Sequence, residues 1–159
     1  MIICNSTPLI AFARIGRLRL LKKIVGELVI PTAVADEISD YGPGQPGFID
    51  ISQETWIKKS AVKSQRQAQL LLPVLDLGEA EVITLALEKS AKLVLIDELT
   101  GRHVAESLGL RVTGSVGILI RAKESGEIDA IKPYLDEMIR QGVRYGKRFI
   151  DQVLKNAGE

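Results

Sequence analysis

Short aliphatic runs alternate along the chain with longer segments in which apolar residues recur at helical spacing. The run Leu-Val-Leu-Ile at 93–96 is typical of a strand that is buried on both faces. We expect strands over residues 2–4, 27–31, 92–96 and 111–113, and a further strand at Trp56 and Ile57. We expect helices over residues 8–24, divided near Gly16, and over 32–41, 64–72, 78–90, 101–110, 115–126, 130–141 and 147–156.

Strands that alternate with helices indicate βαβ crossovers and a mainly parallel sheet. We therefore expect an α/β fold in which a short twisted sheet of about four or five strands carries helices on both faces. The segment GPGQPG at 42–47 contains too much glycine and proline for regular structure, and Thr32 is placed to cap the helix at 32–41. Because no repeat, low-complexity run or linker occurs, we predict a single domain over residues 1–159.

The composition excludes few functions. The formal net charge of +1 excludes a strong global attraction to nucleic acid or anionic membranes, but it leaves room for a local basic patch. The single cysteine, Cys4, lies in an apolar run and is interpreted as a small buried side chain. The chain starts without the basic segment of a signal peptide, and no apolar run approaches the ~20 residues that span a bilayer. We therefore expect a cytoplasmic protein without membrane contact.

Polar residues follow two of the expected strands. Asn5 follows the first strand, and Asp97, with Glu98 behind it, follows the strand at 92–96. In open parallel sheets, ligands bind at the carboxyl ends of the strands, so both positions are candidates for a site. The structural alternative for Asp97 is a cap on the helix that comes next.

Two further acids lie on helix faces that are otherwise apolar. Glu79 shares its face with Val82 and Ile83, and Glu37 lies at helical spacing from Val34, so both carboxylates are expected to point inward. A buried carboxylate is costly unless it is paired, hydrogen-bonded or bound to a cation. Structural alternatives stay open, since Glu79 would interact favourably with the helix dipole and Glu37 would pair with a nearby arginine.

Together, Asn5, Glu37, Glu79 and Asp97 form a set of oxygen ligands without histidine or cysteine. Such a set suits a hard cation, either Mg²⁺ or Mn²⁺. Sites of this kind serve phosphoryl chemistry, in which the ion activates water and stabilises the transition state.

The chain also carries several longer segments in a fairly specific order and spacing. They are NSTPLIAFARIGRLRLL (5–21), VIPTAVADEI (29–38), LDLGEAEVITLALE (75–88), LVLIDELTGRHVAESLGLRVTGSVGILIRAKESGEI (93–128) and the closing GE (158–159). In these segments the chain resembles PIN domains, which are metal-dependent, ribonuclease-like α/β proteins with a three-layer fold. The resemblance covers nearly the whole chain and is weakest around 42–47.

Carried over by position, the resemblance assigns the family's four acidic positions to Asn5, Glu37, Glu79 and Asp97, which would hold the metal and act in catalysis. Position 5 departs from the family's pattern, which has aspartate there. The amide oxygen of asparagine still ligates a cation, but one unit of charge is missing. The resemblance also implies accessory roles for residues near these positions, namely Ser6, Thr7, Glu98 and either Thr113 or Ser115.

Basic residues supply candidates for substrate binding. Arg102 follows Asp97 closely in the sequence and would either meet a substrate phosphate or pair with that acid. Arg144, Lys147 and Arg148 lie in a basic segment that could track a phosphate backbone, although such a run is often only a solvated face.

The leading functional prediction is a Mg²⁺- or Mn²⁺-dependent endoribonuclease that cleaves single-stranded RNA. By resemblance alone, the protein would be the toxin of a toxin–antitoxin pair, with a small antitoxin protein as its partner, and it would form a homodimer. The alternative is a PIN-like module with a weakened site that binds RNA or a protein without cleavage, which Asn5 and the near-neutral charge favour. A third alternative is an interaction protein without a nucleic-acid role, whose acids are solvated or salt-bridged.

Overall fold

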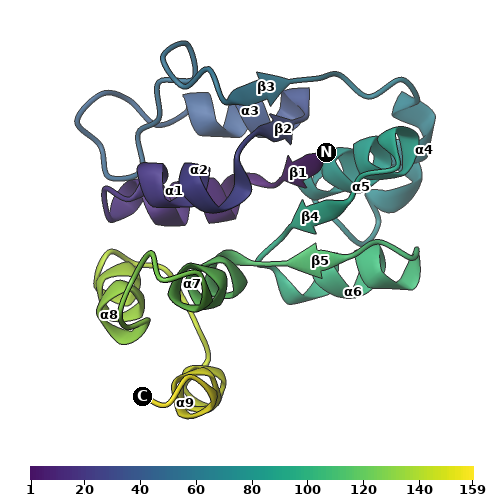
Figure 1. Cartoon of the computed structure of the whole chain (residues 1–159). Coiled ribbons are helices and arrows are strands. Elements are labelled where there is room, and N and C mark those ends of the chain that lie inside the picture. Colours follow the sequence, from purple (N-terminus) through teal and green to yellow (C-terminus); the bar gives the residue numbers. More distant parts are fainter.

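A computed structural model describes residues 1–159 as an α/β fold (Figure 1). The strands are β1 (Ile2–Cys4), β2 (Leu28–Ile30), β3 (Ile57–Lys59), β4 (Leu93–Leu95) and β5 (Val112–Thr113). The helices are α1 (Ser6–Arg14), α2 (Leu18–Val25), α3 (Thr32–Ser39), α4 (Gln65–Leu71), α5 (Leu77–Lys89), α6 (Leu99–Ser107), α7 (Ser115–Glu124), α8 (Lys132–Arg140) and α9 (Lys147–Asn156). Every helix and strand expected from the pattern is present, with bounds that differ by a few residues.

The strands form one sheet in the order β3–β2–β1–β4–β5, and all neighbouring strands are parallel. The first strand is central, because Ile3 pairs with Val29 of β2 on one side and with Val94 of β4 on the other. Helices α5 and α6 pack against the sheet from one side (Figure 1). Helix α7 packs against β5 from the other side and contacts α1 and α2. The expected α/β fold with helices on both faces of a parallel sheet is confirmed.

The core between these layers is largely aliphatic. Ile3 and Leu95 of the sheet and Ile83 of α5 are fully buried, and Phe12 of α1 joins them. Cys4 is also fully buried, and this burial raises the pKa of its thiol well above the ordinary value. None of the helices combines the length and apolar character that crossing a bilayer requires.

Two local predictions are wrong in detail. The residue in the capping position of α3 is Pro31, and Thr32 is the first helical residue and makes no capping bond. The backbone N–H of Ala33 instead donates to Glu81 of α5 over 3.1 Å. The capping acceptor therefore comes from a helix that is far away in the sequence and packs against α3. Trp56 lies directly before β3 rather than within it, although its carbonyl oxygen still accepts a hydrogen bond from β2.

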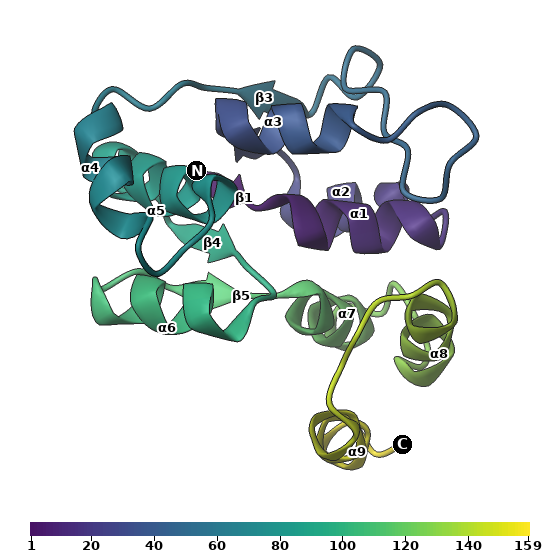
Figure 2. The same ribbon diagram turned by 180° about the vertical axis from the view of Figure 1, so that it is seen from behind.

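The topology fixes where a site is expected. From β1 the chain adds β2 and β3 on one side of the sheet, and it then crosses to add β4 and β5 on the other (Figure 2). The carboxyl ends of β1 and β4 lie side by side at the point where the winding direction reverses. Crevices at such points are the usual ligand sites of open parallel sheets.

Candidate active site

Asn5 and Asp97 both lie at this reversal point. Asn5 follows β1 directly, and its backbone N–H donates to the carbonyl oxygen of Leu95 in β4 over 2.9 Å. Asp97 comes two residues after Leu95, so the ladder between the two strands brings both polar side chains to the same edge of the sheet. The structure thus places together two residues that are far apart in the sequence.

Asn5 caps helix α1, and its side-chain oxygen lies near the carboxylate of Glu37. The residue is 3% exposed, and its Oδ1 accepts the backbone N–H of Ser6 over 2.9 Å. A Cβ atom added to Gly78 would lie 3.4 Å from this oxygen and would collide with Oε1 of Glu37. The side-chain oxygens of Asn5 and Glu37 therefore both lie against Gly78, in the first turn of α5, and a larger residue there would displace Glu37.

Glu37 reaches this position from α3. The Ser6 hydroxyl donates to its Oε2 over 2.5 Å. Burial raises the pKa of the Glu37 carboxyl, the Ser6 bond lowers it, and the negative charges of Asp76 and Asp40 raise it further. The predicted arginine partner of Glu37 is wrong, since no arginine forms an ion pair with it.

The two carboxylate oxygens of Glu79 have different surroundings. Its Oε2 accepts the backbone N–H of Asp76 over 3.2 Å, and Asp76 in return accepts the N–H of Glu79 over 2.8 Å, which forms a capping box at the start of α5. Its Oε1 has no hydrogen-bond partner and faces Gly101 of α6, where an added Cβ would lie 3.1 Å away. Burial raises the pKa of Glu79, and the nearby carboxylates of Asp76, Glu98 and Glu37 raise it as well, whereas the backbone hydrogen bond lowers it. The helix-terminus interpretation thus accounts for one oxygen and leaves the other free.

Asp97 is bound from the opposite side of the crevice. The Ser115 N–H donates to Oδ1 over 2.7 Å, and the Ser115 hydroxyl lies 3.0 Å from both carboxylate oxygens. Asp97 is therefore hydrogen-bonded to the start of α7, and the prediction that it caps the next helix, α6, is wrong because Glu98 occupies that position without a side-chain bond. Burial raises the pKa of Asp97, while the Ser115 bonds and the guanidinium of Arg102 lower it.

The negative charge of these acids is not neutralised by ion pairs. All ion pairs of the structure involve other acids, and Arg102 approaches Asp97 near Gly114 without forming one. As the side chains stand, no three of them close on one point where a metal ion would be held. The side-chain oxygens of Asn5 and Glu37 lie against Gly78, Oε1 of Glu79 faces α6, and Asp97 is hydrogen-bonded to α7.

The donors nonetheless fit a hard divalent cation. Mg²⁺ keeps several waters and needs only one or two carboxylates, so the pair Asn5 and Glu37, the free oxygen of Glu79 and the carboxylate of Asp97 supply enough oxygen donors. Buried carboxylates without a cationic partner are costly, and a bound cation would remove much of that cost.

A groove of about 430 Å³ runs alongside Asp97. Helix α1 contributes Thr7 and Arg14 to its wall, and the segment between α8 and α9 contributes Arg144 and Tyr145. Further lining residues are Ile10, Ala11, Tyr41, Glu98, Leu99, Gly142 and Val143. The groove therefore combines positive charge and aromatic rings beside the carboxylates.

The remaining candidates divide between this groove and other surfaces. Ser6 bonds to Glu37, Thr7 and Glu98 line the groove, and Ser115 bonds to Asp97. Thr113 does not contact these acids, because its hydroxyl lies against Gly117 on α7. The exposed residues Lys147 and Arg148 do not line the groove.

Sequence reasoning missed Arg14 and Tyr41 as wall residues of the groove. Arg14 lies two helical turns after Thr7 and so shares its face of α1, a signal that would have found it. Its Nε atom is buried without a hydrogen-bond partner, and its Nη1 donates to the carbonyl of Gln141 over 3.4 Å. Tyr41 follows a helix end and carries no comparable signal.

The family assignment agrees with this arrangement. The model of a family described as PIN domain, DUF3368, matches residues 1–159, and the chain therefore belongs to the PIN-domain family. PIN domains are typically nucleases that bind nucleic acid and use divalent metal ions. A search among curated proteins found no match to this chain.

Proposed function

We propose that this protein is a Mg²⁺- or Mn²⁺-dependent endoribonuclease that hydrolyses single-stranded RNA. The observation that carries the proposal is the gathering of Asn5, Glu37, Glu79 and Asp97 around one sheet edge without a cationic partner. Membership of the PIN-domain family supports the same chemistry.

Each of the chain's own groups has a role in this proposal. Glu37 and Asp97 would hold the metal, Asn5 would add a neutral oxygen ligand, and Glu79 would contribute its free Oε1. Ser6 and Ser115 orient Glu37 and Asp97 through hydrogen bonds and leave lone pairs of the carboxylates open. A divalent ion bound there supplies activation of the attacking water and stabilisation of the charge that develops on the phosphate.

The groove beside Asp97 favours a single strand as substrate. Arg14 and Arg144 would contact the phosphate backbone, and Tyr41 and Tyr145 line the same groove, where unpaired bases would stack on their rings. A duplex keeps its bases stacked inside and would not use these rings. The toxin role, an antitoxin partner and a homodimer are proposed from the resemblance alone, because PIN domains are often the toxins of toxin–antitoxin pairs.

One experiment compares metal binding and cleavage in the same samples. Wild type, Asp97→Asn and Asp151→Asn are titrated with MnCl₂ by calorimetry, melted with and without Mn²⁺, and incubated with a labelled single-stranded RNA. Asp151 is an exposed acid of α9 away from the crevice, so it is the matched control. We expect Mn²⁺ at about 100 times its Kd to stabilise wild type and Asp151→Asn by about 2.7 kcal/mol, and to leave Asp97→Asn nearly unchanged.

The alternative is a module that binds RNA without cleavage, which the neutral Asn5 favours. It predicts that wild type binds the labelled RNA with a steep salt dependence, shows no Mn²⁺ heat at millimolar concentration and leaves the RNA intact. That result would end the endoribonuclease proposal. Metal-dependent cleavage that Asp97→Asn abolishes and Asp151→Asn retains would support it.

A further inference from the structure

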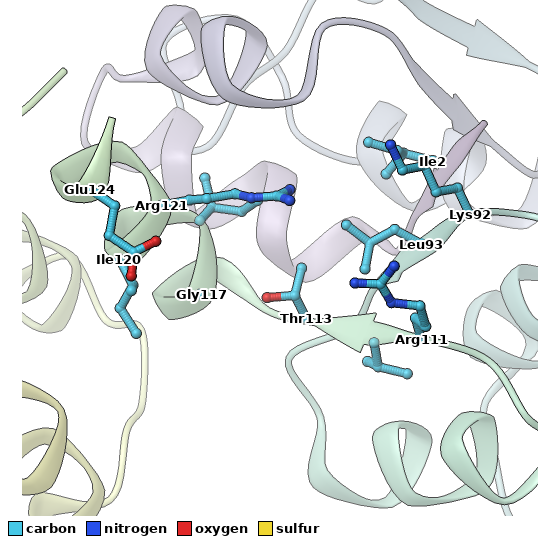
Figure 3. A pocket seen from close by; sticks show the side chains of 11 residues that line it. Ile2, Lys92, Leu93, Arg111, Thr113, Gly117, Ile120, Arg121 and Glu124 are labelled. Atoms are coloured by element: carbon cyan, nitrogen blue, oxygen red, sulfur yellow. The ribbon is translucent and has the colours of Figure 1, made fainter. Parts of the chain in front are cut away.

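A second pocket lies away from the carboxylates, between α7 and the β5 edge of the sheet (Figure 3). It has a volume of about 260 Å³ and shares no lining residue with the groove beside Asp97. Its floor is formed by the first residues of β1 and β4 and by β5, and α7 forms one wall. The proposed nuclease chemistry does not use this pocket.

Three cations surround this pocket. Arg121 of α7 and Arg111, the residue before β5, extend toward the same open space (Figure 3). Lys92 lies at the far side of the pocket. None of the three forms an ion pair or a side-chain hydrogen bond within the chain. The single acid of the lining, Glu124, lies toward the end of α7, so the pocket carries an excess of positive charge.

A hydroxyl group faces the same space. Thr113 of β5 points toward Gly117 of α7, and a Cβ atom on Gly117 would collide with the Thr113 hydroxyl oxygen. Because Gly117 has no side chain, it leaves room for this hydroxyl between the helix and the strand. This hydroxyl donates to no other side chain, so it is available as a hydrogen-bond donor beside the two guanidinium groups.

We propose that this pocket binds a phosphate group. Guanidinium groups match the geometry of phosphate oxygens with paired N–H donors, and charge-assisted bonds of this kind are the stronger ones. A volume of about 260 Å³ holds a phosphate or pyrophosphate, and it is smaller than the pockets that enclose whole drug-sized ligands. The phosphate comes either from a small free compound or from an RNA strand, since both sources present negatively charged oxygens on a tetrahedral phosphorus that guanidinium groups bind.

The test is a pyrophosphate titration by calorimetry in a buffer with EDTA. The chelator removes divalent ions, so pyrophosphate cannot bind through a metal ion at the carboxylates. It uses wild type, Arg111→Gln, Arg121→Gln and Arg66→Gln. Arg66 is an exposed arginine of α4 outside the pocket, and its substitution removes the same charge. We expect each pocket substitution to weaken pyrophosphate binding at least tenfold and Arg66→Gln to change it less than twofold.

Nuclear magnetic resonance on wild type locates the bound anion without any substitution. The amide signals of Thr113, Gly117 and Arg121 should move on addition of pyrophosphate, and those of α9 should not. Equal weakening by Arg66→Gln, absence of binding, or shifts confined to other surfaces would each overturn the proposal.

The affinity for a labelled single-stranded RNA, measured on the same variants, distinguishes the two sources. If Arg111→Gln weakens pyrophosphate binding and leaves RNA affinity unchanged, the pocket takes a small free phosphate. If both affinities fall together, the pocket takes a phosphate of the RNA strand. If wild type does not bind Mn²⁺ at the carboxylates, the proposed nuclease is contradicted. The pyrophosphate result, obtained in EDTA, would not be affected.

Discussion

Ser115 donates its backbone N–H to Asp97 over 2.7 Å, and its hydroxyl lies 3.0 Å from both carboxylate oxygens of the same acid. The Ser115 hydroxyl also lies 2.6 Å from the hydroxyl of Tyr145, which in turn lies 3.4 Å from the sulfur of Met138. A chain of polar contacts thus links the acid at the end of β4 to α7 and to the segment that follows α8. The orientation of Asp97 depends on residues that come later in the sequence.

Replacement of Ser115 by alanine should raise the pKa of Asp97. The hydroxyl bond favours the ionised carboxylate, so its loss shifts the pKa upward, while the backbone bond remains. We expect a loss of about 1–2 kcal/mol in the free energy of unfolding, because the Tyr145 hydroxyl loses a partner. A carboxyl titration by nuclear magnetic resonance in metal-free buffer measures the shift. Ser107→Ala removes a hydroxyl that bonds only within α6, and an equal effect there would contradict the assignment.

Replacement of Glu81 by alanine should destabilise α3 and leave the metal site intact. Glu81 is 4% exposed and accepts the N–H of Ala33, so alanine would leave a buried donor without a partner. We expect a loss of about 1–3 kcal/mol by urea denaturation, and a smaller loss for Glu81→Gln, which keeps an acceptor oxygen. Mn²⁺ affinity should stay within a factor of two. A variant of normal stability that no longer binds Mn²⁺ would instead place Glu81 among the metal ligands.

Replacement of Asn5 by aspartate should strengthen cation binding. Aspartate caps a helix as well as asparagine does, so α1 should be retained. The added charge lies beside Glu37 and should tighten Mn²⁺ binding on the order of tenfold, or ~1.4 kcal/mol, after desolvation offsets part of the attraction. The metal-free protein should melt at a lower temperature because two carboxylates then face Gly78. Calorimetry with Mn²⁺ checks the affinity, and an unchanged Kd would show that position 5 does not contact the ion.

Glu159 should stabilise the protein near neutral pH, and this stabilisation should be lost in acid. Its carboxylate accepts the backbone N–H groups of Ile131 and Lys132 over 2.9 and 3.0 Å and lies 2.9 Å from the Lys123 ammonium. Desolvation alone would raise the pKa of Glu159, but these bonds lower it from 4.5 to about 2. Because the folded pKa is the lower one, this stabilisation is present above about pH 4.5 and is lost as the pH falls toward 2.

The matching measurement is urea denaturation of wild type and Glu159→Gln at pH 6 and pH 3. We expect the variant to be less stable by about 0.5–1 kcal/mol at pH 6, with the difference narrowing at pH 3. Glu106→Gln changes an exposed acid of α6 and controls for the lost charge. A constant difference at both pH values would contradict the role of Glu159.

The elements of the fold follow from local patterns that a single sequence carries. The aliphatic run before Asp97 indicates a buried strand, and Gly16 separates α1 from α2 as expected. The sequence pattern also brings Asn5 and Asp97 to neighbouring strand ends, because parallel strands share one carboxyl edge. These inferences need only the periodicity of the chain and the rules of parallel sheets.

The contacts between side chains could not be predicted in this way. Thr32 has the residue type of a cap, yet Glu81 takes that role because α5 places its carboxylate against the start of α3. Thr113 and Ser115 are equivalent candidates in the sequence. Thr113 is the last residue of β5, and its hydroxyl lies against Gly117, whereas Ser115 begins α7 and reaches Asp97 with its N–H and its hydroxyl. Such choices depend on the distances between elements, which periodicity does not encode.

The central place of β1 has a consequence for synthesis on the ribosome. With β2 and β3 the first 59 residues can form one half of the sheet, but the other edge of β1 stays unpaired until residues 93–95 have left the exit tunnel. Asn5 and Glu37 are made early, and they meet Glu79 and Asp97 only after that second half has docked. A nascent chain therefore carries no assembled carboxylate site, and the crevice comes into existence late in translation.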